Sequence, residues 1–202
     1  MLLNKIDEIV LNNDHDQRAL KLEHLQYEGK RVNDHLVQLL VLYRLNKSQY
    51  FANINEIEIE DFLDEVLSQH QLLLKEHDIT LDLQIEDNLY WYIDRDLIAS
   101  VITNIMNNLY VYTKSKIEIT ANQEQDYMII KIKDDGPGYP EDMLLTVDHN
   151  KQQIDVTSGS TGLGLYFAST AANQHKNKGK TGYITISNDG INNGGCFTIV
   201  IP

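Results

Sequence analysis

The chain has 202 residues, of which 42% are hydrophobic and 23% charged, and this composition is that of a folded globular protein and not of a disordered one. Its formal net charge of −13, with lysines and arginines scattered along the chain, excludes nucleic-acid binding as a primary role. The single cysteine, Cys196, excludes a disulfide framework or a cysteine metal cluster within the chain and fits a reduced cytosolic setting.

The first predicted element is a helical hairpin. Met1–Leu11 has the spacing of a helix that ends at the turn-forming residues Asn12–Asp14, and Arg18–Asn46 is predicted to be one long helix. A heptad seam runs along the long helix through Leu22, Leu25, Gly29, Val32, Leu36, Leu39 and Tyr43. A hairpin this narrow is expected to dimerise into a four-helix bundle, unless its seam packs on the domain that follows.

A mixed α and β pattern follows the polar break at Asn46–Asn55. Alternation and helical spacing predict helices over residues 62–74, 96–113 and 162–173, and strands over 79–85, 117–121, 128–132, 183–187 and 196–201. Asp134–Thr161 is rich in Gly, Asp, Ser and Gln, and we expect a functional lid or a disordered segment there. No stretch approaches the roughly 20 apolar residues of a membrane span, so we expect no membrane contact from this chain.

Three asparagines crowd the helix predicted over residues 96–113. Asn104, Asn107 and Asn108 each cost roughly 0.5 kcal/mol relative to alanine in a helix interior, so helix propensity does not explain them. Asn104 and Asn108 share a face, and a neutral amide oxygen beside bound phosphates can ligate Mg²⁺. The alternative is that these amides cap neighbouring strands or face water.

Two glycine-rich segments add further polar chemistry. Asp134 ends a predicted strand, where its carboxylate can accept a hydrogen bond from an amine such as that of adenine, and Gly136 and Gly138 follow. Gly162 and Gly164 open a helix, where exposed amides favour phosphate. Each segment alone is also compatible with an ordinary turn, and neither a Walker A loop nor a dinucleotide fingerprint is present.

The order of these segments carries a resemblance. An Asn-x-x-x-Asn helix, then Asp-x-Gly-x-Gly after a strand, then Gly-Leu-Gly-Leu opening a helix, then GGCFTIVIP resembles the boxes of the histidine-kinase branch of the Bergerat-fold ATPases over roughly residues 55–202. The segment QRALKLEHLQYEGKRVNDHLVQLLVLYRL looks like the second helix of the dimerisation domain of that branch. Residues 1–50 are accordingly expected to form part of a dimerisation and phosphotransfer hairpin, and residues 55–202 an ATP-binding catalytic domain.

The resemblance implies an α+β fold, a two-layer α/β sandwich in which helices cover one face of a mixed sheet. It also implies ATP and Mg²⁺ as ligands. Asn108 is then the Mg²⁺ ligand, Asn104 a polar partner on the phosphate side, Tyr112 a ring beside the base, and Asp134 the acceptor for the adenine amino group. The remaining positions implied to contact the nucleotide are Gly136, Gly138, Thr161, Gly162, Leu163 and Gly164.

The implied reaction transfers the γ-phosphoryl group of ATP to a histidine and then to an aspartate in the receiver domain of a response regulator. The chain is expected to be a homodimer through its hairpin and to be cytoplasmic, which includes the cytoplasmic part of a membrane-anchored sensor. His15 superficially matches the acceptor motif, but only about one helix separates it from the second-helix segment, so we expect the acceptor upstream of Met1. Without it, the chain binds ATP and does not phosphorylate itself.

Several positions depart from the family pattern. Leu109 and Val111 stand where the family usually has alanine and a basic residue, and Ser160 replaces a glycine. Lys114 or Lys151 are candidates for the missing cation. These departures motivate an alternative, a catalytically inactive dimeric module that responds to nucleotide. A serine kinase of the anti-sigma type shares the fold, but that class lacks a long helical hairpin.

Overall fold

The computed structural model describes residues 29, 32–33, 36–45, 47, 49–146 and 162–202. The chain divides into two compact units, Met1–Tyr50 and Phe51–Pro202. In the first unit, residues 36–45 are helical, as the heptad pattern predicts. The rest of the predicted hairpin, including His15, lies almost entirely outside the described residues.

A five-stranded mixed sheet forms the centre of the second unit. Its strand order is β2-β4-β5-β9-β8, in which β2 and β4 are parallel and the other neighbours are antiparallel. The strands are β2 (Thr80–Ile85), β4 (Lys116–Glu124), β5 (Tyr127–Asp134), β8 (Tyr183–Ser187) and β9 (Cys196–Ile201). Two small antiparallel pairs accompany them, β1 (Ile54–Glu58) with β3 (Tyr90–Asp94) and β6 (Lys176–Asn177) with β7 (Lys180–Thr181).

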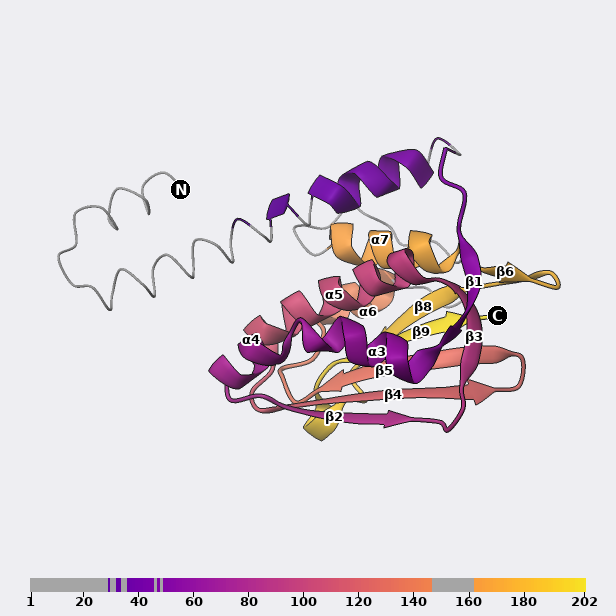
Figure 1. Cartoon of the computed structure of the whole chain (residues 1–202). Helices are drawn as coiled ribbons and strands as arrows, with labels where there is room; N and C mark the ends of the chain where they lie inside the picture. Colours follow the sequence, from indigo (N-terminus) through magenta and orange to yellow (C-terminus); the bar gives the residue numbers. More distant parts are fainter. Residues whose placement is uncertain (1–28, 30–31, 34–35, 46, 48, 147–161) are drawn as a thin grey trace. The chain divides into compact units, whose positions relative to one another are not determined.

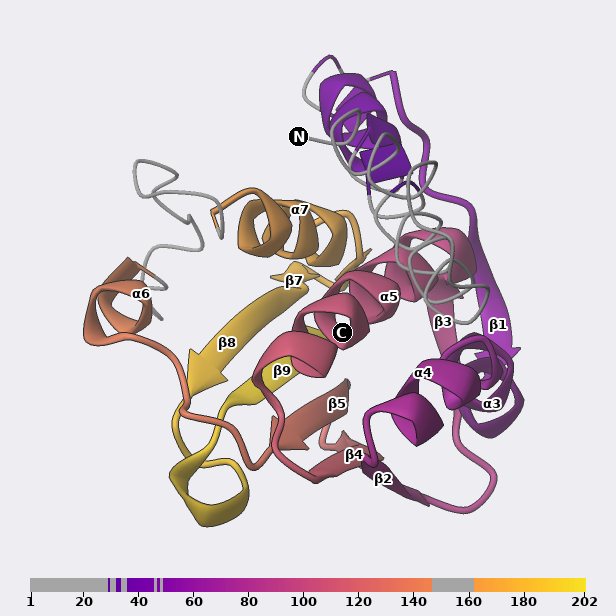
Figure 2. The same cartoon turned by 90° about the vertical axis from the view of Figure 1, so that its left-hand side faces the viewer.

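Helices cover one face of this sheet (Figure 1, Figure 2). They are α3 (Ile59–Ser68), α4 (Gln71–Glu76), α5 (Arg95–Tyr112) and α7 (Gly162–Ala172). Two short elements complete the unit, α6 (Glu141–Thr146) after β5 and the single turn η1 (Ile191–Asn193) before β9. Strand alternation explains the two layers, because Met128, Ile130 and Ile132 of β5 are buried while the residues between them are partly exposed. The predicted two-layer α+β fold is confirmed.

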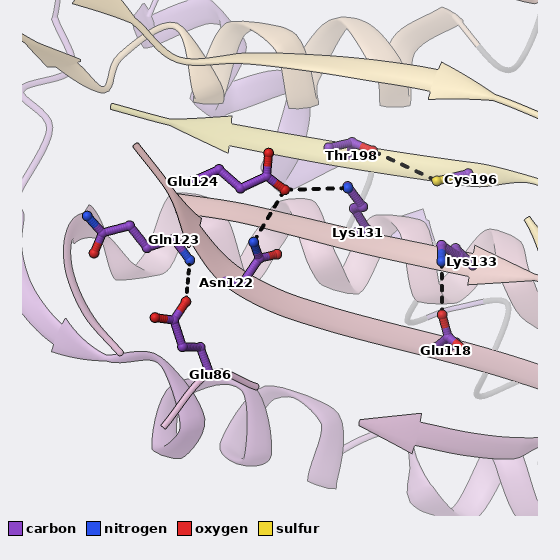
Figure 3. A network of polar contacts seen from close by, with 9 residues as sticks. All are labelled: Glu86, Glu118, Asn122, Gln123, Glu124, Lys131, Lys133, Cys196 and Thr198. Atoms are coloured by element: carbon purple, nitrogen blue, oxygen red, sulfur yellow. Dashed lines mark hydrogen bonds and ion pairs between the residues drawn. The ribbon is translucent and has the colours of Figure 1, made fainter. Parts of the chain in front are cut away.

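The open face of the sheet is polar. Lys133 of β5 pairs with Glu118 of β4 at 3.0 Å, and Lys131 pairs with Glu124 at 3.8 Å, in the network drawn in Figure 3. Cross-strand pairs of opposite charge suit a face that meets water. The core therefore lies between the sheet and the helices, and any site that needs burial lies on that side.

The start of α5 is defined by a side-chain cap. Asp94 has an extended backbone, and its Oδ1 accepts a hydrogen bond from the N–H of Leu97 at 3.1 Å. The other carboxylate oxygen, Oδ2, accepts from the N–H of Asn53 at 2.8 Å. One buried aspartate thus joins the end of β3, the start of α5 and the segment that leads into β1.

Three parts of the fold differ from the sequence prediction. The helix predicted over residues 62–74 is broken at Gln69 and His70 into α3 and α4, and β1 and β3 were not predicted. The segment Asp134–Thr161, predicted to lack regular structure, contains α6. Pro140 explains the start of α6, because its carbonyl accepts hydrogen bonds from the N–H groups of Met143 and Leu144.

Candidate functional site

A pocket of about 370 Å³ opens between α5, the start of α7, the end of β5 and the loop after β5. This volume lies in the range of about 300 to 1,000 Å³ that is usual for small-molecule sites. Its walls are mostly apolar, with a few polar groups among them. The lining residues are Ile105, Asn108, Leu109, Tyr112, Asp134, Pro137, Gly138, Tyr139, Pro140, Met143, Leu165 and Gly195.

Helix α5 supplies one wall because its contributing residues share a face. Ile105 lies three and four residues before Asn108 and Leu109, and Tyr112 lies four and three residues after them, which are the spacings of one helix face. Leu109 is buried, whereas Asn108 is exposed and Tyr112 is 57% exposed. The apolar part of the wall thus lies deeper than the amide and the phenol ring.

Asp134 is the acid of the pocket. It continues the buried row of β5, so its carboxylate lies on the helix-covered side, and only 6% of the residue is exposed. Burial raises the pKa of this carboxyl group, against the opposing effect of hydrogen bonds from the backbones of Gly136 and Gly195, and the charge of Asp135 raises it further. The Oδ1 atom accepts from the N–H of Gly136 at 2.7 Å.

The neighbouring Asp135 has a structural role outside the pocket. Its carboxylate accepts hydrogen bonds from the N–H groups of Lys114, Ser115 and Lys116 at 3.0, 3.0 and 3.2 Å, and from the Ser115 hydroxyl at 2.7 Å. Burial raises the pKa of Asp135, but these hydrogen bonds outweigh burial and bring the pKa down to about 2. Asp135 therefore fixes the turn after α5 and leaves Asp134 to the pocket.

The loop after Asp134 is held in a defined shape. Gly138 has a φ of +76°, a region in which residues with a Cβ are strained. The Asn188 side chain brackets the next residue, since its Oδ1 accepts from the N–H of Tyr139 at 2.6 Å and its Nδ2 donates to the Tyr139 carbonyl at 3.0 Å. Burial, together with the charge of Asp134, raises the pKa of Tyr139, so its hydroxyl stays neutral.

Helices α5 and α7 approach closely beside the pocket. A Cβ built on Gly164 would lie 2.7 Å from Nδ2 of Asn104, so only glycine fits there without movement. Asn104 is 5% exposed, and its Nδ2 has no hydrogen-bond partner within the described part of the chain. A buried donor without a partner lowers the stability of the fold. Such a donor is typical of a group that binds a ligand or a water molecule.

The predicted site residues come together to different degrees. Asn108, Tyr112, Asp134 and Gly138 line the pocket, Gly136 lies against the Tyr112 carbonyl, and Asn104 faces Gly164 at the pocket's edge. Gly162 and Leu163 form the first turn of α7 and are not among the lining residues. Thr161, Ser160 and Lys151 lie outside the described residues.

The structure adds residues that the motifs did not indicate. Tyr139, Pro140 and Met143 line the pocket, and Asn188 supports it from the turn after β8. Pro137 and Leu165, which stand within the two glycine motifs, also line it. The adjacent Asp-Gly-Pro-Gly run was a signal for the loop residues, but Met143 and Asn188 belong to segments without a motif. The final glycines also contribute, since a Cβ on Gly194 would lie 2.0 Å from the Asp134 carbonyl and one on Gly195 2.6 Å from its carboxylate.

No group of three or more His, Cys, Asp or Glu residues in residues 49–146 and 162–202, or in the described positions before them, is arranged to hold a metal ion. Within the same described part, no helix combines the length and the apolar character needed to cross a membrane.

Comparison with known proteins agrees with the fold. Residues 93–202 match the family described as histidine kinase-, DNA gyrase B- and HSP90-like ATPases. The sensor histidine kinase WalK of Bacillus subtilis is 27% identical over 158 residues, which are 74% of this chain and 26% of WalK. The chain thus spans about a quarter of the length of this curated relative.

Solved structures of histidine kinases share the fold. The histidine kinase AdeS of Acinetobacter baumannii superimposes with a TM-score of 0.74 at 22% identity, over 99% of this chain and 92% of AdeS. Histidine kinase ThkA, in a complex with the response regulator protein TrrA, gives a TM-score of 0.66 at 18% identity over 100% of this chain and 58% of ThkA.

The fold and the pocket define a nucleotide-binding α+β domain of the ATPase type. Because the family match covers more than half of the chain, the chain belongs to the family of histidine kinase-, DNA gyrase B- and HSP90-like ATPases. The predicted family is therefore confirmed, and the relatives named above place the chain among sequences similar to sensor histidine kinases.

Proposed function

We propose that the chain binds Mg²⁺-ATP in this pocket as the catalytic core of a sensor histidine kinase. The observation that carries the proposal is the buried Asp134 carboxylate at the edge of an apolar pocket of about 370 Å³. Backbone N–H groups already donate to this carboxylate, whose two oxygens have capacity for a further donor, and the exocyclic amine of adenine is a donor of the right kind.

The inner part of the pocket suits the base. Ile105, Leu109, Met143 and Leu165 provide apolar surface for a flat aromatic ring, while Asp134 distinguishes an amine from a carbonyl on that ring. Guanine presents a carbonyl oxygen where adenine presents its amine, and this oxygen would face the carboxylate. We therefore assign adenine as the preferred base.

The outer part of the site suits the phosphates. Asn108 is exposed at the opening, and the amide nitrogen of Asn104 has no partner among the residues that the structure describes. The first turn of α7 offers backbone N–H groups with the favourable end of the helix dipole. Asn108 would ligate Mg²⁺ through its amide oxygen. When bound, the ion neutralises charge on the phosphates; the chain's own contribution is to position them.

The complete reaction transfers the γ-phosphoryl group to a histidine of the dimerisation domain and then to an aspartate of a response regulator. Two findings support this proposal: the similarity to WalK, and the shared fold with ThkA, which has been crystallised with TrrA. A neutral imidazole is already a nucleophile near neutral pH, so positioning is the main demand on the protein. The similarity to WalK and the shared fold with ThkA also lead us to propose a cytoplasmic location for the chain.

One observation favours a second candidate, an inactive module that responds to nucleotide without transferring phosphate. Val111, at the position where the family usually has a basic residue, is 62% exposed and does not line the pocket. A protein that includes the acceptor histidine decides between the two candidates. Radiolabel passed from γ-labelled ATP to that histidine supports the kinase, and nucleotide binding without transfer supports the module.

The binding test is a titration of the chain with a fluorescent ATP analogue, competed by ATP and GTP. We expect Asp134→Asn to weaken ATP binding at least tenfold, because the variant presents an amide that competes as a donor, and we expect ATP to outcompete GTP at least tenfold in the wild type. Asp87→Asn removes the same charge from an exposed loop and should bind ATP normally.

The metal-dependent part of binding is tested with and without Mg²⁺. Asn108→Ala should remove the gain in affinity that Mg²⁺ gives and leave the metal-free affinity within about twofold. Equal affinities of wild type, Asp134→Asn and Asn108→Ala for ATP would mean that nucleotide binds elsewhere or not at all.

A further inference from the structure

A buried histidine joins α5 and α7, the two helices that flank the pocket, at the end of the helix pair that does not line it. His175, three residues after the end of α7, is 2% exposed. Its Nδ1 lies 3.0 Å from the carbonyl of Ala171 on α7, and its Nε2 lies 2.9 Å from the N–H of Asp94, the cap of α5. Since a backbone N–H can only donate, Nε2 is the acceptor and the proton resides on Nδ1.

The two helices therefore touch at two defined points. Near its start, α7 meets α5 where Gly164 packs on the Asn104 amide, and at its end it meets the N-terminus of α5 through His175. The helices run side by side in opposite directions (Figure 1, Figure 2). An α7 of 11 residues is about 16 Å long, so the two contacts fix it at both ends.

Short side chains make part of the apolar contact of α7. Ala168, Ala171 and Ala172 are at most 1% exposed, whereas Phe167 of the same helix is a large, fully buried side chain that anchors the helix in the core. A hydrogen bond, in contrast, depends on distance and angle and weakens steeply when either changes. The contact from His175 to Asp94 is the directional one at this end.

We propose that His175 is a positioning residue for the nucleotide site, which sets the place of α7 along α5 and hence that of the phosphate-side turn Gly162–Gly164 relative to Asn104 and Asn108. The role in binding rests on the proposed function; the role in helix placement does not. The histidine touches no part of the pocket itself.

The test compares two replacements in the whole chain. His175→Gln keeps an acceptor at about the distance of Nε2, whereas His175→Leu keeps the volume and removes it. We expect His175→Leu to weaken binding of the fluorescent ATP analogue about fivefold or more, the effect of one lost hydrogen bond, and His175→Gln to stay within about twofold of wild type. Ile119→Val, a buried change in β4 away from the pocket, controls for lost stability and should bind normally.

A second readout does not depend on nucleotide. Nuclear Overhauser contacts between the Asn104 side-chain amide and the Gly164 α-protons should be present in wild type and His175→Gln and weakened in His175→Leu. Unchanged contacts and affinity in folded His175→Leu, or a Gln variant as impaired as the Leu variant, would overturn the proposal. If the wild type binds no nucleotide, the proposed function fails, and the Overhauser contacts alone decide the placement of α7.

Discussion

Asp134 and Asp135 show how adjacent residues of one type acquire different roles from the alternation of a strand end. Asp134 points under the helices, where burial raises its pKa, whereas Asp135 turns toward the end of α5 and accepts four hydrogen bonds. The sequence predicted an acid at this strand end, and Asp134 was the residue assigned to the nucleotide site. It did not indicate the structural task of Asp135, because that depends on three N–H groups some 20 residues earlier.

The first prediction concerns Asp135 and acid. Its pKa is lowered from 3.8 to about 2 in the folded chain, so its carboxylate stabilises the fold fully above about pH 4, and this contribution is lost as the pH falls from about 4 to 2. We expect Asp135→Ala to lower the free energy of unfolding at pH 7 by about 2 kcal/mol. Urea titrations at pH 7 and pH 2.5 check both effects.

The control for this prediction is Asp87→Ala, which removes an exposed carboxylate from a loop. We expect little change in its unfolding midpoint at either pH. At pH 2.5 the gap between wild type and Asp135→Ala should shrink, and a gap equal to that at pH 7 would contradict the proposed charge dependence.

At the scale of elements, strand alternation and helical spacing predicted the five strands of the main sheet together with α5 and α7. These patterns did not predict features that depend on residues far away in the chain. Strand β1 exists because its backbone pairs with β3, for example Glu56 opposite Tyr92, and its own sequence lacks a clear alternation. His175 likewise carries no local signal, because the N–H that it accepts comes from Asp94, 81 residues earlier.

The second prediction tests the close contact of α5 and α7. Gly164→Ala places a Cβ 2.7 Å from Asn104 Nδ2, so the buried Asn104 side chain or the helix must shift, which should cost about 1 to 3 kcal/mol in unfolding free energy. Asn104→Ala removes the obstacle, so the double variant should regain much of that loss. Thermal unfolding of the wild type, the two single variants and the double variant gives the coupling free energy between residues 104 and 164. Losses of stability that simply add in the double variant would contradict the contact.

At the scale of the whole molecule, the order of the motifs resembled that of a known family and so predicted both the family and its fold. The same resemblance predicted that these segments, which are distant in sequence, meet at one site. The pocket brings together Asn108 of α5, Asp134 of β5 and Gly195 of the turn before β9. Its apolar lining was harder to foresee. Met143 comes from α6, in a segment that composition predicted to be without regular structure.

The third prediction concerns assembly. In the first unit, the helix over residues 36–45 exposes Leu36, Leu39 and Tyr43 by 60%, 47% and 58%, and these are seam positions of the predicted hairpin. We propose that a second copy covers them. Light scattering after size exclusion should give twice 23.2 kDa for the wild type and 23.2 kDa for Leu36→Glu with Leu39→Glu.

The matched control for assembly is Leu72→Glu, which changes a leucine of α4 that is 68% exposed in the second unit. It should remain dimeric. A monomeric wild type, or a dimer that persists in the double variant, would exclude the hairpin seam as the interface.

Strand β9 is the latest of the five strands in chain order, yet it lies between β5 and β8. On the ribosome, a chain synthesised only as far as β8 lacks β9, the strand that pairs with β8 in the described sheet, and it also lacks Gly194 and Gly195, which pack against Asp134. Completion of the sheet and formation of the nucleotide pocket therefore coincide, and an interrupted translation product should fail to retain ATP.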